Sequence, residues 1–276
     1  MNMKSENEVQ LEKRMLPGSP VAYFISDEGH DEWVLFLHAA FVTHEMFRMQ
    51  FGYFRDKYNI LAVDIIGHGL STDTRKGDSI LKMSEWTSDI LKAEGIDKVH
   101  IVGVSLGAVL AQDFANRYPD SVRSLACFGG YDINNFDTDI QKENSSRQML
   151  MMLKALFSVK WFAKANRKIS AYTPQAQDDF YDMNIRFQKK SFMFLAGLDG
   201  MVNRHRTGKR NYPLLTGCGR HDIPMELEVV KTWHAAEPDS RMVIFENAGH
   251  CVNMDVPMKF NRTLESFWKE SCPKES

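Results

Sequence analysis

The chain has 276 residues, of which 43% are hydrophobic and 25% are charged, a composition typical of globular proteins and unlike that of disordered or membrane-embedded chains. Its formal net charge of −2 gives no electrostatic reason to expect a nucleic acid or an anionic membrane as partner. Residues 1–14 are polar and charged, and no run approaches the roughly 20 apolar residues that a membrane span needs. We therefore expect a cytoplasmic protein with one main domain.

The chain begins with two short strand-like runs around a turn at residues 17–18, the second over residues 21–25, and these predict an antiparallel hairpin. Residues 33–38 are continuously apolar, as a strand buried on both faces requires. A helical segment over residues 43–54 then leads to a further strand over residues 59–64.

The next segments continue this alternation. An amphipathic helix is predicted over residues 80–93 because apolar residues recur there with helical spacing. A strand over 99–102, a helix over 105–118 and a strand over 122–128 follow. This rhythm predicts right-handed crossovers and a mostly parallel sheet.

The alternation is interrupted over residues 135–210, where only helical stripes occur. We interpret this segment as a helical lid, inserted into a core domain formed by residues 1–134 and 211–276. Beyond it, the sequence predicts strands over 213–216 and 242–245, separated by a helix over 226–236, and an amphipathic C-terminal helix.

The sequence G-V-S-L-G, at residues 103–107, lies between a predicted strand and a predicted helix. A serine at such a turn adopts strained backbone angles, and flanking glycines relieve the crowding. The helix that starts at Ser105 also directs its N-terminal amides toward any oxyanion formed there. The pattern therefore predicts Ser105 as a nucleophile.

A serine hydroxyl needs a base and an orienting carboxylate to become a good nucleophile. His250 follows the strand over 242–245, and Asp222 follows the strand over 213–216. The carboxyl ends of parallel strands share one edge of a sheet, so both residues are predicted to lie beside Ser105. Asp132, after the strand over 122–128, is an alternative acid.

Other polar residues are expected to be structural. His38 and His68 lie at a strand end and in a turn, where histidines usually bond locally, and His234 lies on a predicted helix. The four cysteines are scattered without the spacing of a zinc knuckle or a redox Cys-x-x-Cys. The histidines show no metal-ligand spacing, so we expect no metal and no cofactor.

Four motifs occur in the order found in one large family: D-I-I-G-H-G-L-S at residues 64–71, the serine motif, the segment around Asp222, and A-G-H ending at His250. On these motifs the chain resembles the α/β-hydrolase superfamily, and more narrowly its small capped serine esterases and enol-lactonases. The resemblance covers nearly everything outside residues 135–210. It implies an α/β-hydrolase fold, with a mostly parallel eight-stranded sheet flanked by helices and an inserted helical lid.

The resemblance also implies an oxyanion hole made by the backbone amides of Ala40 and Leu106. Here the sequence departs from the family, because His38 is followed by Ala39 instead of glycine. Alanine tolerates fewer backbone angles than glycine, so the placement of the Ala40 amide is less well determined than that of Leu106.

The function expected is hydrolysis of a carboxylic ester or lactone through an acyl-enzyme on Ser105, with His250 as general base and acid and Asp222 orienting it. Carbon–carbon bond hydrolysis is an alternative. A second alternative is a ligand-binding signalling protein of the same fold that retains the triad. We expect a small-molecule substrate and a monomer or homodimer.

Two features of the lid bear on the substrate. Residues 135–210 contain fourteen Lys and Arg against seven Asp and Glu, a local charge of +7 that leaves −9 elsewhere and would suit an anionic substrate. A methionine-rich stripe would suit apolar groups, although such stripes are most often packed core. Its candidate substrate-binding residues are Met149, Met152, Leu153, Leu156 and, nearby, Trp161.

Overall fold

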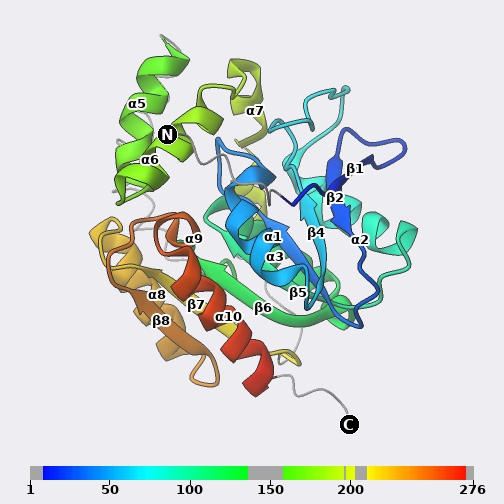
Figure 1. Ribbon diagram of the computed structural model, residues 1–276. Helices are drawn as coiled ribbons and strands as arrows, with labels where there is room; N and C mark the ends of the chain where they lie inside the picture. Colours follow the sequence, from blue (N-terminus) through cyan, green and yellow to red (C-terminus); the bar gives the residue numbers. More distant parts are fainter. Residues whose placement is uncertain (1–8, 136–157, 196, 203–209, 272–276) are drawn as a thin grey trace.

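An eight-stranded sheet forms the centre of the computed structural model, which describes residues 9–135, 158–195, 197–202 and 210–271 (Figure 1). The strand order is β1-β2-β4-β3-β5-β6-β7-β8. β1 and β2 form an antiparallel hairpin, β2 pairs antiparallel with β4, and the other pairs are parallel. The strands are β1 (Glu12–Met15), β2 (Ala22–Ser26), β3 (Trp33–Leu37), β4 (Asn59–Val63), β5 (Val99–Val104), β6 (Val122–Phe128), β7 (Leu214–Gly219) and β8 (Arg241–Phe245).

Helices cover both faces of this sheet. They are α1 (Arg48–Phe54), α2 (Met83–Ala93), α3 (Leu106–Arg117), α8 (Pro224–Ala236), the short α9 (Val252–Asp255) and α10 (Pro257–Ser271). Short 3-10 turns are η1 (His44–Phe47), η2 (Ile80–Lys82) and η3 (Pro119–Ser121). The predicted α/β architecture is therefore confirmed, with two strands longer than expected: β5 continues to Val104 and β7 to Gly219.

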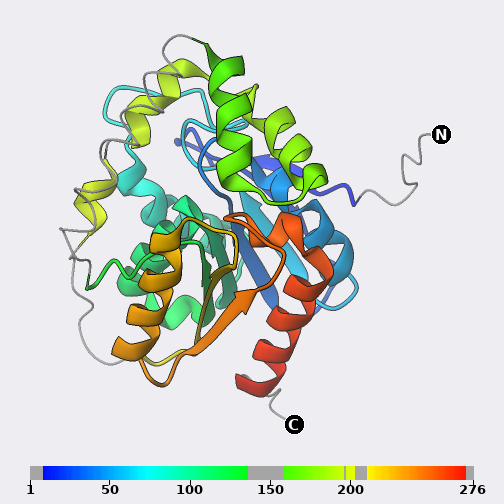
Figure 2. The same ribbon diagram turned by 90° about the vertical axis from the view of Figure 1, so that its left-hand side faces the viewer.

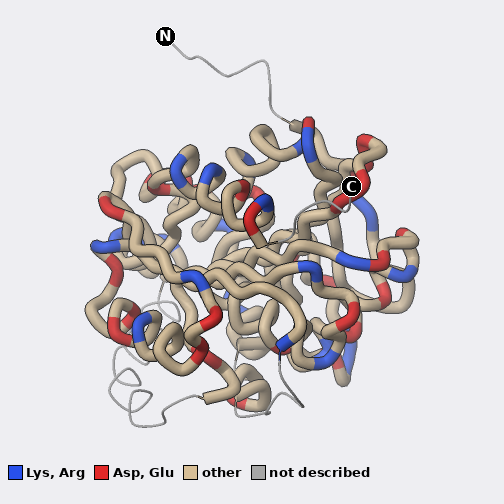
Figure 3. The backbone as a smooth tube through the Cα atoms, turned by 90° about the horizontal axis from the view of Figure 1, so that it is seen from below, with Lys and Arg blue, Asp and Glu red and all other residues tan. Residues whose placement is uncertain are grey.

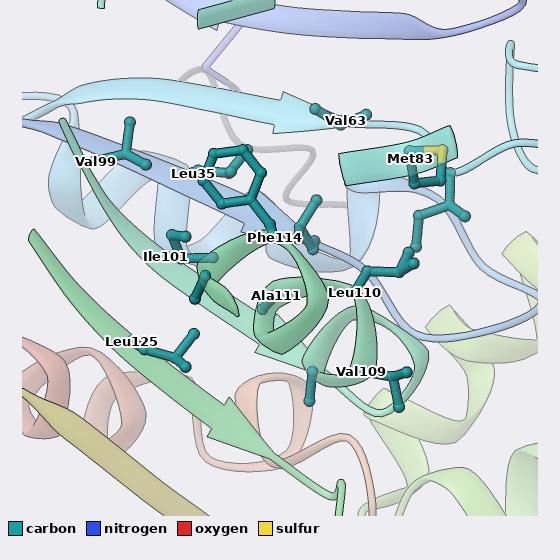
Figure 4. Close-up of a cluster of buried hydrophobic side chains, with 14 of the residues drawn as sticks. Leu35, Val63, Met83, Val99, Ile101, Val109, Leu110, Ala111, Phe114 and Leu125 are labelled. Atoms are coloured by element: carbon teal, nitrogen blue, oxygen red, sulfur yellow. The ribbon is translucent and has the colours of Figure 1, made fainter. Parts of the chain in front are cut away.

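Each face of the sheet has its own apolar core. Because side chains alternate along a strand, Leu35 of β3 packs on one face with α2 and α3, where Figure 4 shows Phe114 lying over the strands. Phe36 faces the other way, against Phe47 of η1 and Phe51 of α1, in a cluster that also contains Phe260 of α10. This double burial explains why residues 33–37 are uniformly apolar.

Every described element between β6 and β7 is helical: α5 (Val159–Ser170), α6 (Pro174–Asn184), η4 (Lys189–Ser191), α7 (Phe192–Leu195) and η5 (Leu198–Met201). Figure 2 shows α5 and α6 side by side above one end of the sheet. Phe180 and Met183 of α6 belong to the same buried cluster as Phe36, so the lid is packed onto the core. The exact lid boundaries stay a prediction.

The surface of the core domain carries mixed charges. Viewed from below in Figure 3, Lys and Arg are interspersed with Asp and Glu around the molecule. Several lid charges are neutralised locally, since Arg167 pairs with Asp178 and Arg186 pairs with Glu45. Of the helices described, none has the length and hydropathy to cross a lipid bilayer.

Candidate active site

Ser105 lies at the sharp turn between β5 and α3. Its backbone angles are φ 54° and ψ −115°, a conformation that a non-glycine residue adopts only where its surroundings enforce it. The Ser105 N–H donates to the Phe128 carbonyl at the end of β6, at 2.8 Å. The serine hydroxyl is thus held at the carboxyl edge of the parallel strands.

The glycines of the motif are required by close backbone approach. A Cβ on Gly107 would lie 1.9 Å from the Leu37 carbonyl oxygen, and a Cβ on Gly103 would lie 2.4 Å from the Gly107 carbonyl oxygen. Both obstructing atoms are backbone atoms, so no side chain can move aside. Glycine at 103 and 107 therefore lets α3 approach β3 and β5 closely enough to form the turn at Ser105.

His250 and Asp222 occupy the loops after β8 and β7, as predicted, and the structure brings them to Ser105. The His250 Nε2 lies 2.8 Å from the Ser105 Oγ, and the His250 Nδ1 lies 3.1 Å from both carboxylate oxygens of Asp222. The side chain of Asp222 is fully buried, and that of His250 is 19% exposed. The three groups form a continuous hydrogen-bonded relay.

The chemistry of the partners sets the tautomer of His250. An ionised carboxylate only accepts hydrogen bonds, so the Nδ1–H donates to Asp222 and the Nε2 accepts from the Ser105 hydroxyl. Burial alone would lower the pKa of His250, but the charge and hydrogen bond of Asp222, aided by the charge of Glu226, raise that pKa above its ordinary value of 6.5. The environment therefore stabilises the imidazolium form.

Two backbone amides beside Ser105 are available as donors. Within the described part of the chain, neither the Ala40 nor the Leu106 N–H has a hydrogen-bond acceptor. Leu106 is the first residue of α3, where the helix dipole favours negative charge. Both amides are thus available as donors, and their role as an oxyanion hole stays a prediction.

The loop that carries Ala40 is fixed by His38. The fully buried His38 ring donates from Nδ1 to the Ala39 carbonyl at 2.7 Å and accepts at Nε2 from the Ile65 N–H at 2.9 Å. This confirms a structural role for His38. Alanine is accommodated at residue 39 because the left-handed backbone of this loop falls on Phe41, with φ 71°.

The other predicted residues have varied surroundings. Asp132 is not the partner of His250: its carboxylate accepts from the backbone and side chain of Asn134. Trp161 lies on α5 and is 52% exposed, so its substrate contact stays a prediction. The remaining stripe residues, Met149, Met152, Leu153 and Leu156, lie outside the described residues.

Three residues near the site had not been singled out from the sequence. Glu226, in the first turn of α8, is only 8% exposed and its Oε2 has no hydrogen-bond partner. Burial raises the pKa of Glu226 to about 7, with the positive charge of His250 opposing and Asp222 adding to the rise. Phe41 packs against three lid rings, and Asp255 bonds to the loop before His250.

The thiol next to His250 is a second potential nucleophile at this site. The described residues contain no cluster of three or more His, Cys, Asp or Glu that could hold a metal ion. Cys251, next to His250, is buried, and burial raises the pKa of its thiol well above 9. A thiol held in its protonated form is a poor nucleophile, which leaves Ser105 as the candidate.

Comparisons with known proteins agree with this fold. The family model described as "Alpha/beta hydrolase family" matches residues 34–263. The chain is 21% identical over 258 residues to (E)-2-((N-methylformamido)methylene)succinate hydrolase of Acinetobacter baylyi, covering 90% of this chain and 94% of that one. It is 25% identical over 225 residues to a putative carbamate hydrolase, RutD, of Escherichia coli O7:K1, covering 78% and 83%.

A solved structure is similar over nearly its whole length. The malate-bound thermophilic esterase from Thermogutta terrifontis superposes with a TM-score of 0.75 at 18% identity, covering 95% of this chain and 99% of the esterase. At this identity the likeness concerns the fold.

Proposed function

The chain belongs to the alpha/beta hydrolase family, and from that premise we propose that it is a serine hydrolase acting on a carboxylic ester or lactone. The observation that carries the proposal is the relay in which the Ser105 Oγ lies 2.8 Å from the His250 Nε2 while Asp222 holds the opposite ring nitrogen. Nucleophile, base and orienting acid are all within hydrogen-bond distance, as triad chemistry requires.

The proposed reaction has two halves. The Ser105 Oγ attacks the carbonyl carbon as its proton passes to His250, and the oxyanion is stabilised by the Ala40 and Leu106 amides. His250 then donates that proton to the leaving oxygen, which gives an acyl-enzyme and an alcohol. A water molecule, deprotonated by His250, attacks the acyl carbon, and the proton returns to Ser105 as the acid leaves.

A second candidate, cleavage of a carbamate or amide, is favoured by the names of the relatives, one a putative carbamate hydrolase and one the hydrolase of an N-methylformamido compound. The same three side chains serve both reactions, since they differ in the leaving group that His250 protonates. We rank esters and lactones above carbamates and amides as substrates because an alcohol is a better leaving group than an amine. The activation barrier of the same reaction is therefore lower for them.

We also propose that the substrate carries a carboxylate. A succinate derivative is named as the substrate of one relative, and the similar esterase structure has malate bound. On this chain, Lys160, Lys164 and Lys168 repeat every four residues along the exposed side of α5 in the lid. Such a row creates a positive potential that raises the local concentration of anions.

A substrate panel with an active-site probe tests the main proposal. We expect multiple turnovers with short p-nitrophenyl esters or lactones, and labelling of the protein by a fluorophosphonate. Ser105→Ala should lose both with little change in thermal stability, because the side chain lies at a turn. An active Ser105→Ala protein would refute the assignment.

The panel also separates the alternatives. It should include carbamates, an N-acyl compound and a diketone that is open to carbon–carbon cleavage, each as acid and as neutral analogue. Turnover of a carbamate in preference to every ester would make the second candidate the main function. A single slow turnover that leaves His250 modified would instead favour a ligand-binding signalling protein.

A further inference from the structure

The lid and the loop carrying His250 share one buried carboxylate. Asp255 ends α9, is only 9% exposed, and accepts hydrogen bonds from both segments. From the junction of α5 and α6, the Tyr172 N–H lies 3.0 Å from both oxygens, and the Thr173 N–H and hydroxyl lie 2.7 and 2.8 Å from Oδ1. From the His250 loop, the Gly249 N–H lies 2.8 Å from Oδ2.

The two residues that flank His250 both contribute to this junction. On one side, Gly249 donates to Asp255. On the other, the Cys251 N–H donates to the carbonyl of Ser170, the last residue of α5, at 2.7 Å. The backbone is therefore attached to the lid on both sides of His250, through Asp255 before it and directly at Cys251 after it.

The acid loop meets the lid at the same place. The ring of Tyr172 stacks on that of His221, the residue before Asp222, with centroids 3.9 Å apart and planes 7° from parallel. The His221 N–H in turn donates to the Ala248 carbonyl at 2.9 Å. The loops that carry the base and the acid are thus joined to each other and to residue 172 of the lid.

We propose that Asp255 is a positioning residue for the hydrolytic reaction, which fixes the His250 ring relative to Ser105 by bonding the lid junction at residues 172–173 to the loop at Gly249. The inference rests on the proposed function. The hydrogen-bond partners of Asp255 among the described residues are all donors, and a carboxylate is suited to this because it is an acceptor at both oxygens. It acts through His250 without contacting the reacting atoms.

The substitution Asp255→Asn tests this with little change of shape. One carboxylate oxygen becomes an NH₂ group, so the variant loses either the bond from the Gly249 N–H or the bond from the Thr173 N–H, while the Tyr172 N–H keeps one oxygen in both orientations. Displacement of a catalytic group by about 1 Å can cost about 10²-fold in rate. We expect kcat to fall by about 10- to 100-fold, with a smaller change in KM.

A matched control is Asp179→Asn. Asp179 of α6 also bonds across the boundary between lid and core, to the Arg48 guanidinium at 2.5 Å, but this pair is exposed and lies outside the His250 loop. The same chemical change there should leave kcat within about twofold, since exposed ion pairs contribute little.

Two readouts distinguish positioning from general stability. The first is the downfield NMR signal of the His250 Nδ1 proton, which should be present in the wild type and in Asp179→Asn and broadened or shifted in Asp255→Asn. The second is the rate of fluorophosphonate labelling, which should fall in parallel with kcat. Wild-type values of both in a folded Asp255→Asn protein would overturn the inference.

Thr173→Val keeps the inference testable if Asp255→Asn does not fold. It removes the hydroxyl that donates to Asp255 and that also caps α6 by accepting from the Ala176 N–H, but it retains both lid N–H groups. We expect kcat to fall by about 2- to 5-fold with the NMR signal shifted, and unchanged values would again overturn the inference. The two proposals fail differently. A wild-type protein that no fluorophosphonate labels contradicts the proposed function, whereas equal labelling of wild type and Asp255→Asn contradicts only the role of Asp255.

Discussion

Replacing Asp222 by Asn tests the relay more directly than any other change outside Ser105. The Asn side chain has nearly the same shape, but its NH₂ group or neutral oxygen faces the His250 Nδ1 where a carboxylate now lies 3.1 Å away. The Ile223 N–H, which donates to the Asp222 Oδ1 at 2.8 Å, favours keeping the amide oxygen on that side. The NH₂ group then faces His250 and favours a ring with its proton on Nε2, the wrong tautomer for accepting the Ser105 proton.

The size of the effect follows from the lost charge. Two unit charges about 4 Å apart interact by about 4 kcal/mol at an effective dielectric constant of about 20, and the contacts of Asp222 with His250 place the pair in this range. When His250 becomes an imidazolium in the transition state, that stabilisation is absent in Asp222→Asn. A loss of about 4 kcal/mol corresponds to about 10³-fold in rate, and the wrong tautomer adds to it.

The assay compares kcat/KM for a p-nitrophenyl ester across pH in wild type, Asp222→Asn and Asp132→Asn. Asp132 is the matched control because its carboxylate bonds to Asn134 and not to His250, so its variant should retain activity within a few-fold. Burial lowers the pKa of His250, and the negative charge of Asp222 is the main influence that raises it. Without that charge, the acid limb of the pH profile of kcat/KM should move to lower pH. Equal losses in the two variants, or a limb that does not move, would refute the reasoning.

Three further predictions follow from the same geometry. Burial lowers the pKa of His250, whereas the negative charges of Asp222 and, more weakly, of Glu226 raise it. Glu226→Gln should therefore move the acid limb of the pH profile of kcat/KM to lower pH, by less than Asp222→Asn does. A shift to higher pH would contradict this. Gly107→Ala should lower both the melting temperature and kcat, because its Cβ would lie 1.9 Å from a backbone oxygen and overpacking costs about 1–3 kcal/mol or more. Gly52→Ala in α1, where a Cβ meets nothing within 4 Å, should preserve or raise the melting temperature. If the positive charge of the lid attracts substrate, kcat/KM for an anionic ester should fall as the salt concentration approaches 1 M, where the Debye length is about 3 Å. The kcat/KM of a neutral analogue should not change. The same salt dependence for both substrates would show that the lid charge does not act on substrate.

The sequence predicted the sheet and the meeting of Ser105, Asp222 and His250 because one rule governs all of them. Residues just past parallel strands collect at one edge of the sheet, and the central strands were identifiable from largely apolar runs such as residues 33–37. The sequence favoured Asp222 as the acid, and excluding the alternative Asp132 needed coordinates. Both follow a strand that ends at this edge, and only the pairing of β7 with β8, together with the local bonds of Asp132 to Asn134, decides which carboxylate reaches His250.

Asp255 and Glu226 were not predictable because their roles arise from contacts distant in sequence. The partners of Asp255 include Tyr172 and Thr173, more than 80 residues earlier, and no periodicity relates these positions. Glu226 is an acidic residue in the first turn of a helix, which in sequence is the pattern of an exposed residue that interacts with the helix dipole. Only the packing of α8 beside the triad shows that its carboxylate is buried.

The same contacts bear on how the lid can vary. Phe41 follows Ala40 in a left-handed conformation that a phenylalanine adopts only under constraint, and its ring packs edge-on or tilted against Phe162, Phe187 and Phe192, all from the lid. On the other side of Ser105, Asp255 bonds the lid to the His250 loop. The lid therefore contacts Phe41, the neighbour of Ala40, and bonds through Asp255 to Gly249, the neighbour of His250. A lid substitution that alters the contacts with Phe41 or Asp255 will also move the loop that carries Ala40 or the loop that carries His250. Substrate specificity can therefore vary without disturbing these loops only at lid positions that contact neither Phe41 nor Asp255.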